Sequence, residues 1–261
     1  MFQNVASVIL SLIGLFAGML VMLQIGRRVG VHRRKLDPDG AATGIGAVDG
    51  AIFGLMGLLI AFTFSTAASR FETRRELIVE EANDIGTAYL RLDLLPASTQ
   101  PALREKFRRY VDSRLAIYHA LPDIEAAKAK MRESKLIQDE IWAAAVAATN
   151  ATQVNGNAVT SLVMSSLNDM IDITTTRTMA MQSHPPQIIF IMLGIMVLAG
   201  ALLIGFGMAG SIKVSWLHVI TFSLLMTGLI YVIVDLEHPR VGIIRVDNFD
   251  QLLVEVRDSM K

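Results

Sequence analysis

The chain has 261 residues, of which 52% are hydrophobic and 18% are charged, and this composition is too apolar for an ordinary soluble domain. Its 24 basic and 24 acidic residues give a formal net charge of zero, which excludes the basic footprint of a nucleic-acid-binding protein. The absence of cysteine excludes disulfides, thiolate metal sites and cysteine nucleophiles.

Four apolar runs occur along the chain, at residues 5–25, 47–68, 187–209 and 215–234. Each is long enough to cross about 30 Å of hydrocarbon as a helix. Positive charges follow the first run instead of preceding it, and no small-residue cleavage site closes it, so we interpret it as a retained span. We therefore expect an all-α fold whose transmembrane helices form two hairpins, residues 1–69 and 186–236.

A charged stretch over residues 70–185 separates the hairpins, and we expect it to form a soluble insert of four helices. The first helix continues the second span without a break, and its apolar residues recur every seven positions, which is typical of a coiled-coil seam. These residues are Phe71, Ile78, Ile85 and Leu92.

The remaining boundaries follow from capping and turn residues. Ser98 or Thr99 caps the second insert helix, and Pro122-Asp123 opens the third. Residues 155–157 form a loop before the fourth helix, which ends before His184-Pro185-Pro186. The C-terminal tail, residues 237–261, carries an amphipathic helix that we expect Asp247 to cap.

The second span carries two stripes of residues. Small residues at three- and four-residue spacing predict close helix packing in lipid: Gly46, Gly50, Gly54 and Gly57. A second stripe lies about 100° around the helix and contains Asp49, Ile52, Phe53, Met56, Ile60 and Thr63. Both stripes are packing surfaces in one interpretation. In the other, one stripe packs while the second lines the central path of an oligomer.

Asp49 is the acid nearest the start of this span. A carboxylate at the membrane edge is costly unless it meets water, a partner or a proton. It either forms a ring at the mouth of a path, which would attract cations, or lies at headgroup depth or caps the helix.

Polar residues elsewhere give weaker signals. Asp235, Glu237 and His238 lie at the exit of the fourth span, where a solvated interface explains them and a functional polar cluster is the alternative. Asp172 and Arg177 flank a threonine run that we interpret as a solvated helix face. The other histidines show no metal-ligand spacing, and no catalytic motif occurs, so we expect no enzyme, metal or cofactor.

The side of the membrane that the insert faces stays open. Five Lys and Arg residues between positions 27 and 35 favour a cytoplasmic first loop, with the insert outside. Five arginines that flank the membrane on the insert side nearly balance them: Arg70, Arg74, Arg75, Arg240 and Arg245.

Two blocks, GAVDGAIFGLMGLLIAFTFSTAASRFETRRELIVEEANDIGTAYLRLDLLP and YVIVDLEHPRVGIIRVD, resemble a bacterial family of membrane proteins called bestrophin-like. The resemblance covers nearly the whole chain. It implies kinship to bestrophins, which are pentameric anion channels with spans that flank a helical cytosolic domain. It also implies that the second span lines the pore through an apolar neck, with Ile52, Met56 and Ile60 and either Phe53 or Phe64 as counterparts. The chain shows no counterpart of the bestrophin calcium-clasp acidic cluster, and Asp49 does not suit an anion path.

The sequence thus predicts a homo-oligomeric ion channel, pentameric by resemblance, that crosses the bacterial inner membrane several times. Its partners would be membrane lipid and a permeant ion, and its insert would form a vestibule or gate. A non-conducting membrane scaffold or sensor is the alternative. A secondary transporter is a weaker third hypothesis, because the two hairpins show no internal match.

Overall fold

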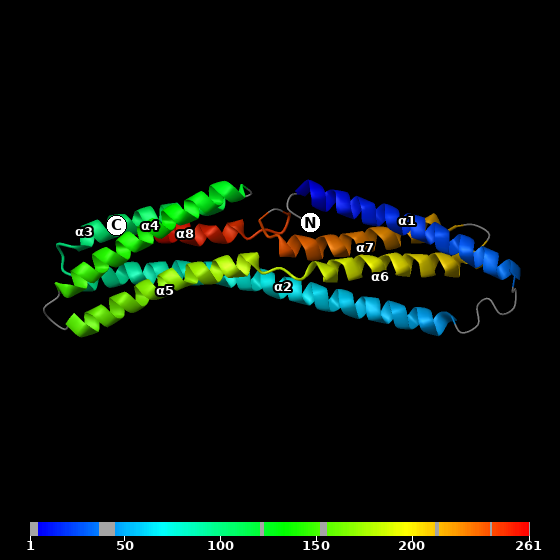
Figure 1. Cartoon of the computed structure of the whole chain (residues 1–261), viewed down its shortest axis with the longest axis horizontal. Coiled ribbons are helices and arrows are strands. Elements are labelled where there is room, and N and C mark those ends of the chain that lie inside the picture. The colour runs from blue at the N-terminus through cyan, green and yellow to red at the C-terminus, as the bar shows by residue number, and fades with distance from the viewer. Residues whose placement is uncertain are drawn as a thin grey trace. The chain divides into compact units, whose positions relative to one another are not determined.

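The structure is a computed structural model and describes residues 5–36, 45–120, 123–151, 156–211, 214–240 and 242–260. All regular structure in these residues is helical (Figure 1), which confirms the all-α prediction. The α-helices are α1 (Val5–Leu36), α2 (Ile45–Arg91), α3 (Gln100–His119), α4 (Ile124–Asn150), α5 (Gly156–Gln182), α6 (Gln187–Gly207), α7 (Trp216–Glu237) and α8 (Gln251–Ser259). Short 3-10 helices are η1 (Leu92–Leu94), η2 (Met208–Gly210) and η3 (Asp247–Asp250).

Four helical segments of the described chain are long and apolar enough to cross a membrane: Ala6–Leu36, Gly46–Leu94, Asn157–Gly210 and Trp216–Glu237. The third segment includes α5 and α6, and its apolar part is α6, which contains no charged residue. The 21 residues of α6 extend about 31 Å at 1.5 Å per residue, which matches the hydrocarbon thickness. The four predicted spans are therefore present as helices that are long and apolar enough to cross a membrane.

The chain divides into two compact units. The apolar unit consists of Met1–Ser69 and His184–Gly242, and the charged unit consists of Arg70–Ser183 and Ile243–Lys261. The helix α2 contributes residues to both units, because it continues without a break from its apolar half into its charged half.

In the apolar unit, α1 packs against α6 and α7. Glycine brings α1 and α6 into backbone contact: a Cβ atom at Gly26 would lie 1.9 Å from the carbonyl oxygen of Leu202. Likewise, a Cβ atom at Gly205 would lie 2.0 Å from the carbonyl oxygen of Leu23. Only glycine fits at these two positions, and small residues at a helix interface are the usual device for close packing in lipid.

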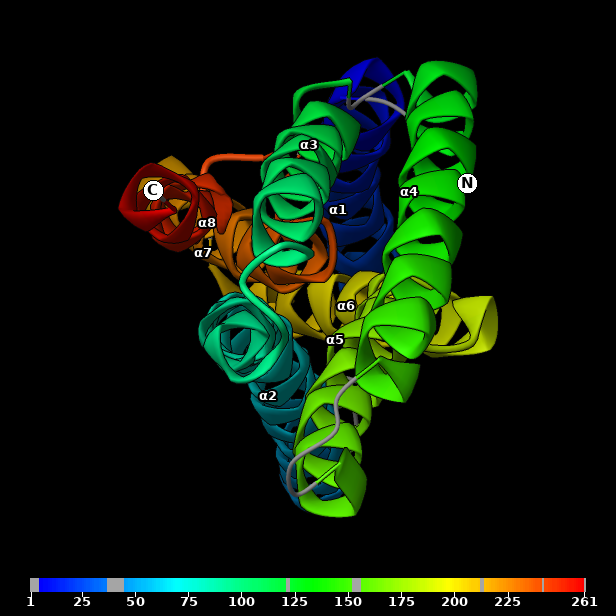
Figure 2. The same ribbon diagram turned by 90° about the vertical axis from the view of Figure 1, so that its left-hand side faces the viewer.

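In the charged unit, α3 contacts both α4 and α8, and α4 contacts α5 (Figure 2). The predicted seam of α2 enters this core, since Ile78, Ile85 and Leu92 are buried while Phe71 is half-buried. The ring of Tyr89 meets that of Phe107 edge to face, with 5.8 Å between centroids. The largest fully buried partners from the other helices are Tyr110, Phe107, Leu103, Ile141, Leu167 and Met170.

The helix ends agree in part with the capping predictions. The Asp123 carboxylate accepts a 3.0 Å hydrogen bond from the amide of Ala126 and caps α4, as predicted, while Pro122 lies outside the described residues. Thr99 occupies the N-cap position of α3, but its hydroxyl donates to the carbonyl of Pro96 and accepts no hydrogen bond from the first turn of the helix. The predicted side-chain cap from Ser98 or Thr99 is therefore wrong: the backbone of Thr99 is helical, whereas a capping residue usually has an extended backbone.

Two further boundaries need correction. Helix α5 already begins at Gly156, so the predicted 155–157 loop is wrong at its last two positions, and Asn155 lies outside the described residues. Asp247 begins η3, four residues before α8, and Asp250 occupies the α8 N-cap without a side-chain bond, so the predicted Asp247 cap is wrong. The tail itself packs on the core of the charged unit through the fully buried Leu253.

Candidate functional site

One face of the apolar half of α2 packs inside the chain. Met56, Ile60 and Thr63, from the predicted pore stripe, are buried. A Cβ atom at Gly200 of α6 would lie 3.3 Å from the Phe53 ring and 3.4 Å from the Met56 sulfur, so this face lies against α6. The Thr63 hydroxyl donates to the carbonyl of Leu59 at 2.7 Å and is satisfied within the helix.

The small-residue stripe of the same helix is open. A Cβ atom added at Gly46, Gly50, Gly54 or Gly57 would meet no described atom within 4 Å. Large side chains beside this stripe are exposed as well: Leu55, Leu58 and Phe62. Within one chain, the stripe predicted to line a pore is thus the better packed of the two, and the stripe predicted to pack has no neighbour in the described chain.

The other predicted pore residues lie at the margins of the packed face. Asp49, Ile52 and Phe53 are half-buried, and Phe64 is exposed. Asp49 follows the first turn of α2, so it lies where this helix begins. The role of all these residues in a pore stays a prediction.

Polar residues gather at the end of α7 around two buried carboxylates, Asp235 and Glu237. This α7-end cluster also contains the half-buried Tyr231 and His238, the exposed His184 and the backbone of Gly242. Asp235 and Glu237 are almost fully buried, at 4% and 1% exposure, so the solvated interpretation is wrong for both. The Tyr231 hydroxyl donates to Asp235 Oδ1 at 3.3 Å. A Cβ atom at Gly242 would lie 1.4 Å from the same oxygen, so the chain after α7 passes directly over this carboxylate.

Two histidines complete the α7-end cluster. His184 Nδ1 lies 3.7 Å from Glu237 Oε2, and the imidazole rings of His184 and His238 stack with centroids 5.1 Å apart. His238 Nδ1 lies 3.0 Å from the carbonyl of Val234, which fixes the orientation of its ring. The structure therefore brings together the predicted polar candidates at this exit, and adds His184 from the segment before α6.

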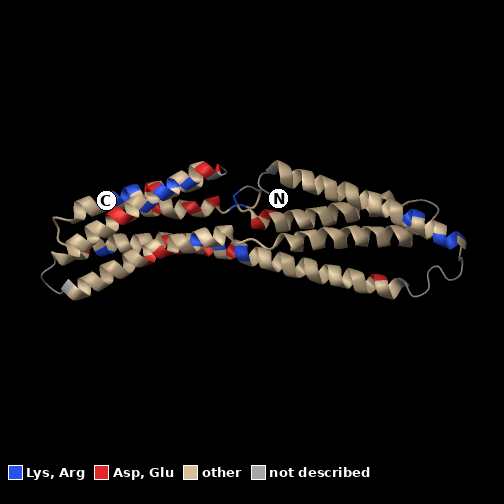
Figure 3. Cartoon of the chain, in the orientation of Figure 1, with Lys and Arg blue, Asp and Glu red and all other residues tan. Residues whose placement is uncertain are grey.

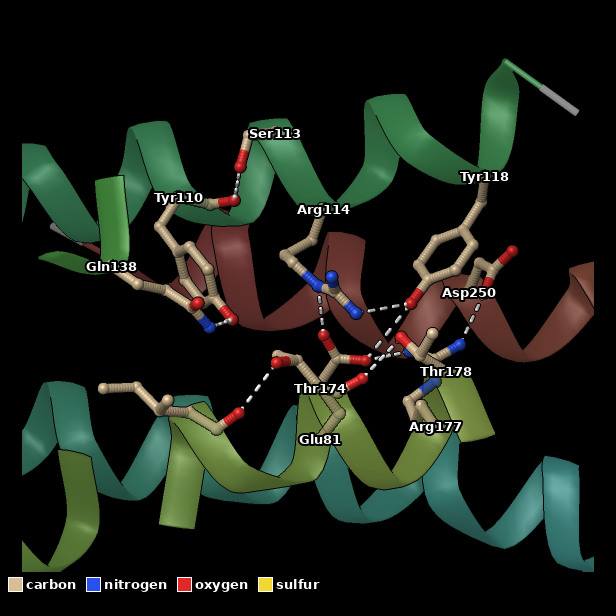
Figure 4. Close-up of polar contacts among 11 residues, drawn as sticks. Glu81, Tyr110, Ser113, Arg114, Tyr118, Gln138, Thr174, Arg177, Thr178 and Asp250 are labelled. Carbon is tan, nitrogen blue, oxygen red and sulfur yellow. Dashed lines mark hydrogen bonds and ion pairs between the residues drawn. The ribbon is translucent and has the colours of Figure 1, made fainter. Parts of the chain in front are cut away.

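A second buried cluster, which the sequence did not predict, lies in the charged unit (Figure 4). Glu81 of α2 is fully buried and accepts from Arg114 Nε of α3 at 2.5 Å and from Arg177 Nη1 of α5. Both arginines are also buried, so the solvated interpretation of Arg177 is wrong, while Asp172 is exposed as expected. Asp250, in η3, lies 4.0 Å from Arg177 Nη2. One carboxylate thereby joins three helices.

Tyr118 closes this cluster. Its hydroxyl accepts from Arg114 Nη2 at 2.8 Å and donates to Glu81 Oε2 at 3.4 Å, and the Arg177 guanidinium lies 4.5 Å from the centre of its ring. Burial would raise the pKa of the Glu81 carboxyl, but the charges of Arg114 and Arg177 and their hydrogen bonds hold that pKa below its ordinary value. Burial alone would lower the pKa of Arg114, yet its contacts with Tyr118 and Glu81 raise it. These groups stay charged, and we interpret the cluster as a structural pin.

The sequence contains a register signal for Glu81. It lies three residues after Ile78 and four before Ile85, so a helix places it on the same face as these seam residues. A charged residue at a core position requires a partner, but the sequence does not say which. Among the described residues, no group of three or more His, Asp or Glu side chains could hold a metal ion.

Comparisons with known proteins place this geometry among its relatives. A family model described as a Bestrophin-like domain matches residues 13–248. A mutant of a bacterial bestrophin homolog from Klebsiella pneumoniae is 13% identical, with 93% of this chain and 98% of that chain covered and a TM-score of 0.64. Another mutant of that homolog is 14% identical, with 97% and 99% covered and the same TM-score. A mutant described as a membrane protein is 13% identical, with 94% and 98% covered and a TM-score of 0.66. At these identities the likeness shows a shared fold. No curated protein matches the chain.

Proposed function

The chain is a membrane protein that belongs to the Bestrophin-like family, and from this premise we propose that it assembles into an oligomeric ion channel with α2 around the pore. In this proposal the helices of residues 70–185 form a four-helix soluble insert that acts as a vestibule or gate. The resemblance to bestrophins favours five copies, and a bacterial inner membrane is the proposed location.

The open face of α2 is the observation that carries this proposal. Exposed apolar side chains such as Leu58 and Phe62 lie beside four glycines that no described atom approaches. A membrane helix with one packed face and one open small-residue face suits contact with further copies of itself around an axis. The fold that the chain shares with a bacterial bestrophin homolog supports the same arrangement.

The packing of α2 suggests how the pore residues are divided. Phe64 is exposed beside the open glycine stripe, whereas Phe53 and Met56 lie against α6 and Ile60 is buried within the chain. We therefore assign the apolar constriction to Phe64, and assign Phe53, Met56, Ile60 and Thr63 to the layer behind it. Asp49 forms a charged ring at the mouth, and the glycine stripe admits the neighbouring copy.

Cysteine substitution tests this division directly, because the natural chain contains no cysteine. The purified protein is reconstituted in liposomes, and ion flux is measured before and after addition of a charged thiol reagent. We expect modification to reduce flux through Phe64→Cys and to leave Met56→Cys and Ile60→Cys unchanged. The opposite pattern would indicate that Met56 and Ile60 line the pore.

Selectivity and the alternative function are tested in the same liposomes. If Asp49 forms the ring, Asp49→Asn shifts the reversal potential in a salt gradient, and an unchanged potential removes Asp49 from the filter. The absence of flux in every salt, pH and calcium condition would favour the alternative of a non-conducting scaffold or sensor.

A further inference from the structure

The end of the apolar unit where α1 and α6 finish is strongly basic (Figure 3). Five cationic side chains occupy the last turns of α1: Arg27, Arg28, Arg33, Arg34 and Lys35. The described residues of α1, η2, the turn after it and the first turn of α7 contain no Asp or Glu, while α2, which begins at the same end (Figure 3), carries Asp49. The basic residues outnumber this acid, so the surface of α1 and η2 attracts anions.

Two of the arginines are held against the same turn. Arg27 Nη2 donates to the carbonyl of Ser211 at 3.2 Å. The Arg34 guanidinium lies over Gly210, where an added Cβ atom would come within 2.6 Å of Nη1. Seven residues correspond to about two helical turns, so Arg27 and Arg34 lie on one face of α1. Their guanidinium groups offer planar forks of N–H donors, which suit the oxygen atoms of a phosphate.

The position of this pair along the spans points to a lipid phosphate. The apolar run of α1 ends at Ile25, immediately before Arg27. The exposed Trp216 begins α7, after the same turn. Tryptophan and arginine at the ends of spans are typical of the headgroup layer of a bilayer.

Capping of the α6 end is the simpler explanation for the Arg27 contact with Ser211. It does not account for the exposed Arg28, Arg33 and Lys35, none of which has an acidic residue of α1 beside it. Nor does it account for a second arginine on the same turn.

We propose that this surface binds the headgroup of an anionic phospholipid, with Arg27 and Arg34 in contact with the phosphate. Arg28, Arg33 and Lys35 supply general attraction, which weakens at high salt. The proposal concerns a lipid site and does not depend on whether the chain conducts ions.

Trp216 provides a local reporter for the experiment. The chain has two tryptophans, so Trp142→Phe leaves Trp216 as the fluorophore. In this background the full-length protein is reconstituted with brominated phosphatidylglycerol or brominated phosphatidylcholine, and quenching is measured against lipid fraction. We expect phosphatidylglycerol to quench at a several-fold lower fraction. Equal quenching by the two lipids would overturn the proposal.

Charge-matched variants separate a built site from diffuse attraction. Diffuse attraction to an anionic surface contributes at most roughly fivefold in affinity per basic residue, so Arg33→Gln/Lys35→Gln should lose no more than roughly 25-fold of the preference. Arg27→Gln/Arg34→Gln removes the same charge together with the phosphate contacts, and should lose several-fold more. An equal loss in the two variants would show diffuse attraction and overturn the proposed site.

Two more measurements test the two partners of the contact, which are the guanidinium groups of the protein and the phosphate of the lipid. Arg27→Lys/Arg34→Lys keeps the charge but removes the planar forks, so it should lose part of the preference while folding normally; full retention would contradict guanidinium contacts. Inorganic phosphate added to the wild-type protein should leave the preference unchanged. If phosphate abolishes it at constant ionic strength, the surface is a site for free phosphate and the lipid assignment is wrong.

Discussion

Replacement of Glu81 by glutamine should strongly destabilise the charged unit. The substitution preserves the side-chain volume but removes the one carboxylate that lies against both Arg114 and Arg177 in a fully buried position. Removal of one partner from a buried ion pair costs about 3–5 kcal/mol. Asp250 remains 4.0 Å from Arg177, so Arg114 is the arginine that loses its carboxylate partner altogether. At about 2–4 °C per kcal/mol, the melting temperature should fall by roughly 6–20 °C.

The assay is thermal melting of the purified protein in detergent, followed by far-ultraviolet circular dichroism, with hydrogen exchange to locate the loss in α3 and α5. Glu80→Gln is the matched control, because Glu80 is exposed on the same helix, and it should change stability by less than about 0.5 kcal/mol. Replacement of all three charges by apolar residues of similar volume should recover much of the loss. If Glu81→Gln melts with the wild-type protein, the cluster does not pin the three helices.

Three further results are expected. Burial opposes the ionised form of Glu81 but the arginines hold its pKa below the ordinary 4.5, so the stabilisation that Glu81 contributes should be present above about pH 4.5 and be lost as the pH falls below it. The acid decline in the free energy of unfolding should therefore be smaller in Glu81→Gln. Gly26→Ala forces a methyl group onto a facing carbonyl and should cost about 1–3 kcal/mol or more, whereas Gly14→Ala, with open space around it, should not. Gly242→Ala should displace the Asp235 carboxylate and lower the melting temperature of the full-length protein.

Each of these expectations has an outcome that would contradict it. An acid decline of equal size in Glu81→Gln would assign that decline to other carboxyl groups. If Gly26→Ala and Gly14→Ala behave alike in thermal melting, the α1–α6 backbone contact does not stabilise the unit. Gly207 also faces open space, so Gly207→Ala is the control for Gly242→Ala, and equal melting of these two variants would contradict the close approach to Asp235.

The helical content and the spans were predictable because they depend on local pattern. Uncharged runs of membrane length identify the spans, and the period of Ile78, Ile85 and Leu92 identifies the seam. The partners of Glu81 depend on tertiary structure, since Arg114 lies 33 residues away and Arg177 lies 96 residues away. From the sequence alone, the charge of Arg177 favours a solvated position, and this prediction is wrong because Arg177 is buried against Glu81.

The two stripes of α2 show the same limit. The sequence indicates that small residues permit close approach, but it does not say which helix approaches. In the structure Gly200 of α6 meets Phe53 and Met56, while Gly54 meets nothing described. The backbone contact between α1 and α6 instead uses Gly26 and Gly205, which lie outside the stripes of the second span.

The contact of α1 with α6 also has a dynamic consequence. At Gly26 and Gly205 the two helices meet through Cα atoms and carbonyl oxygens, with no side chain between them. Formation of the contact at these two glycines therefore costs no side-chain rotamer entropy. If one helix slid along the other by a residue, a neighbouring side chain would have to enter the same narrow gap. The pair should move as a single rigid body, with slow hydrogen exchange along the α1–α6 contact.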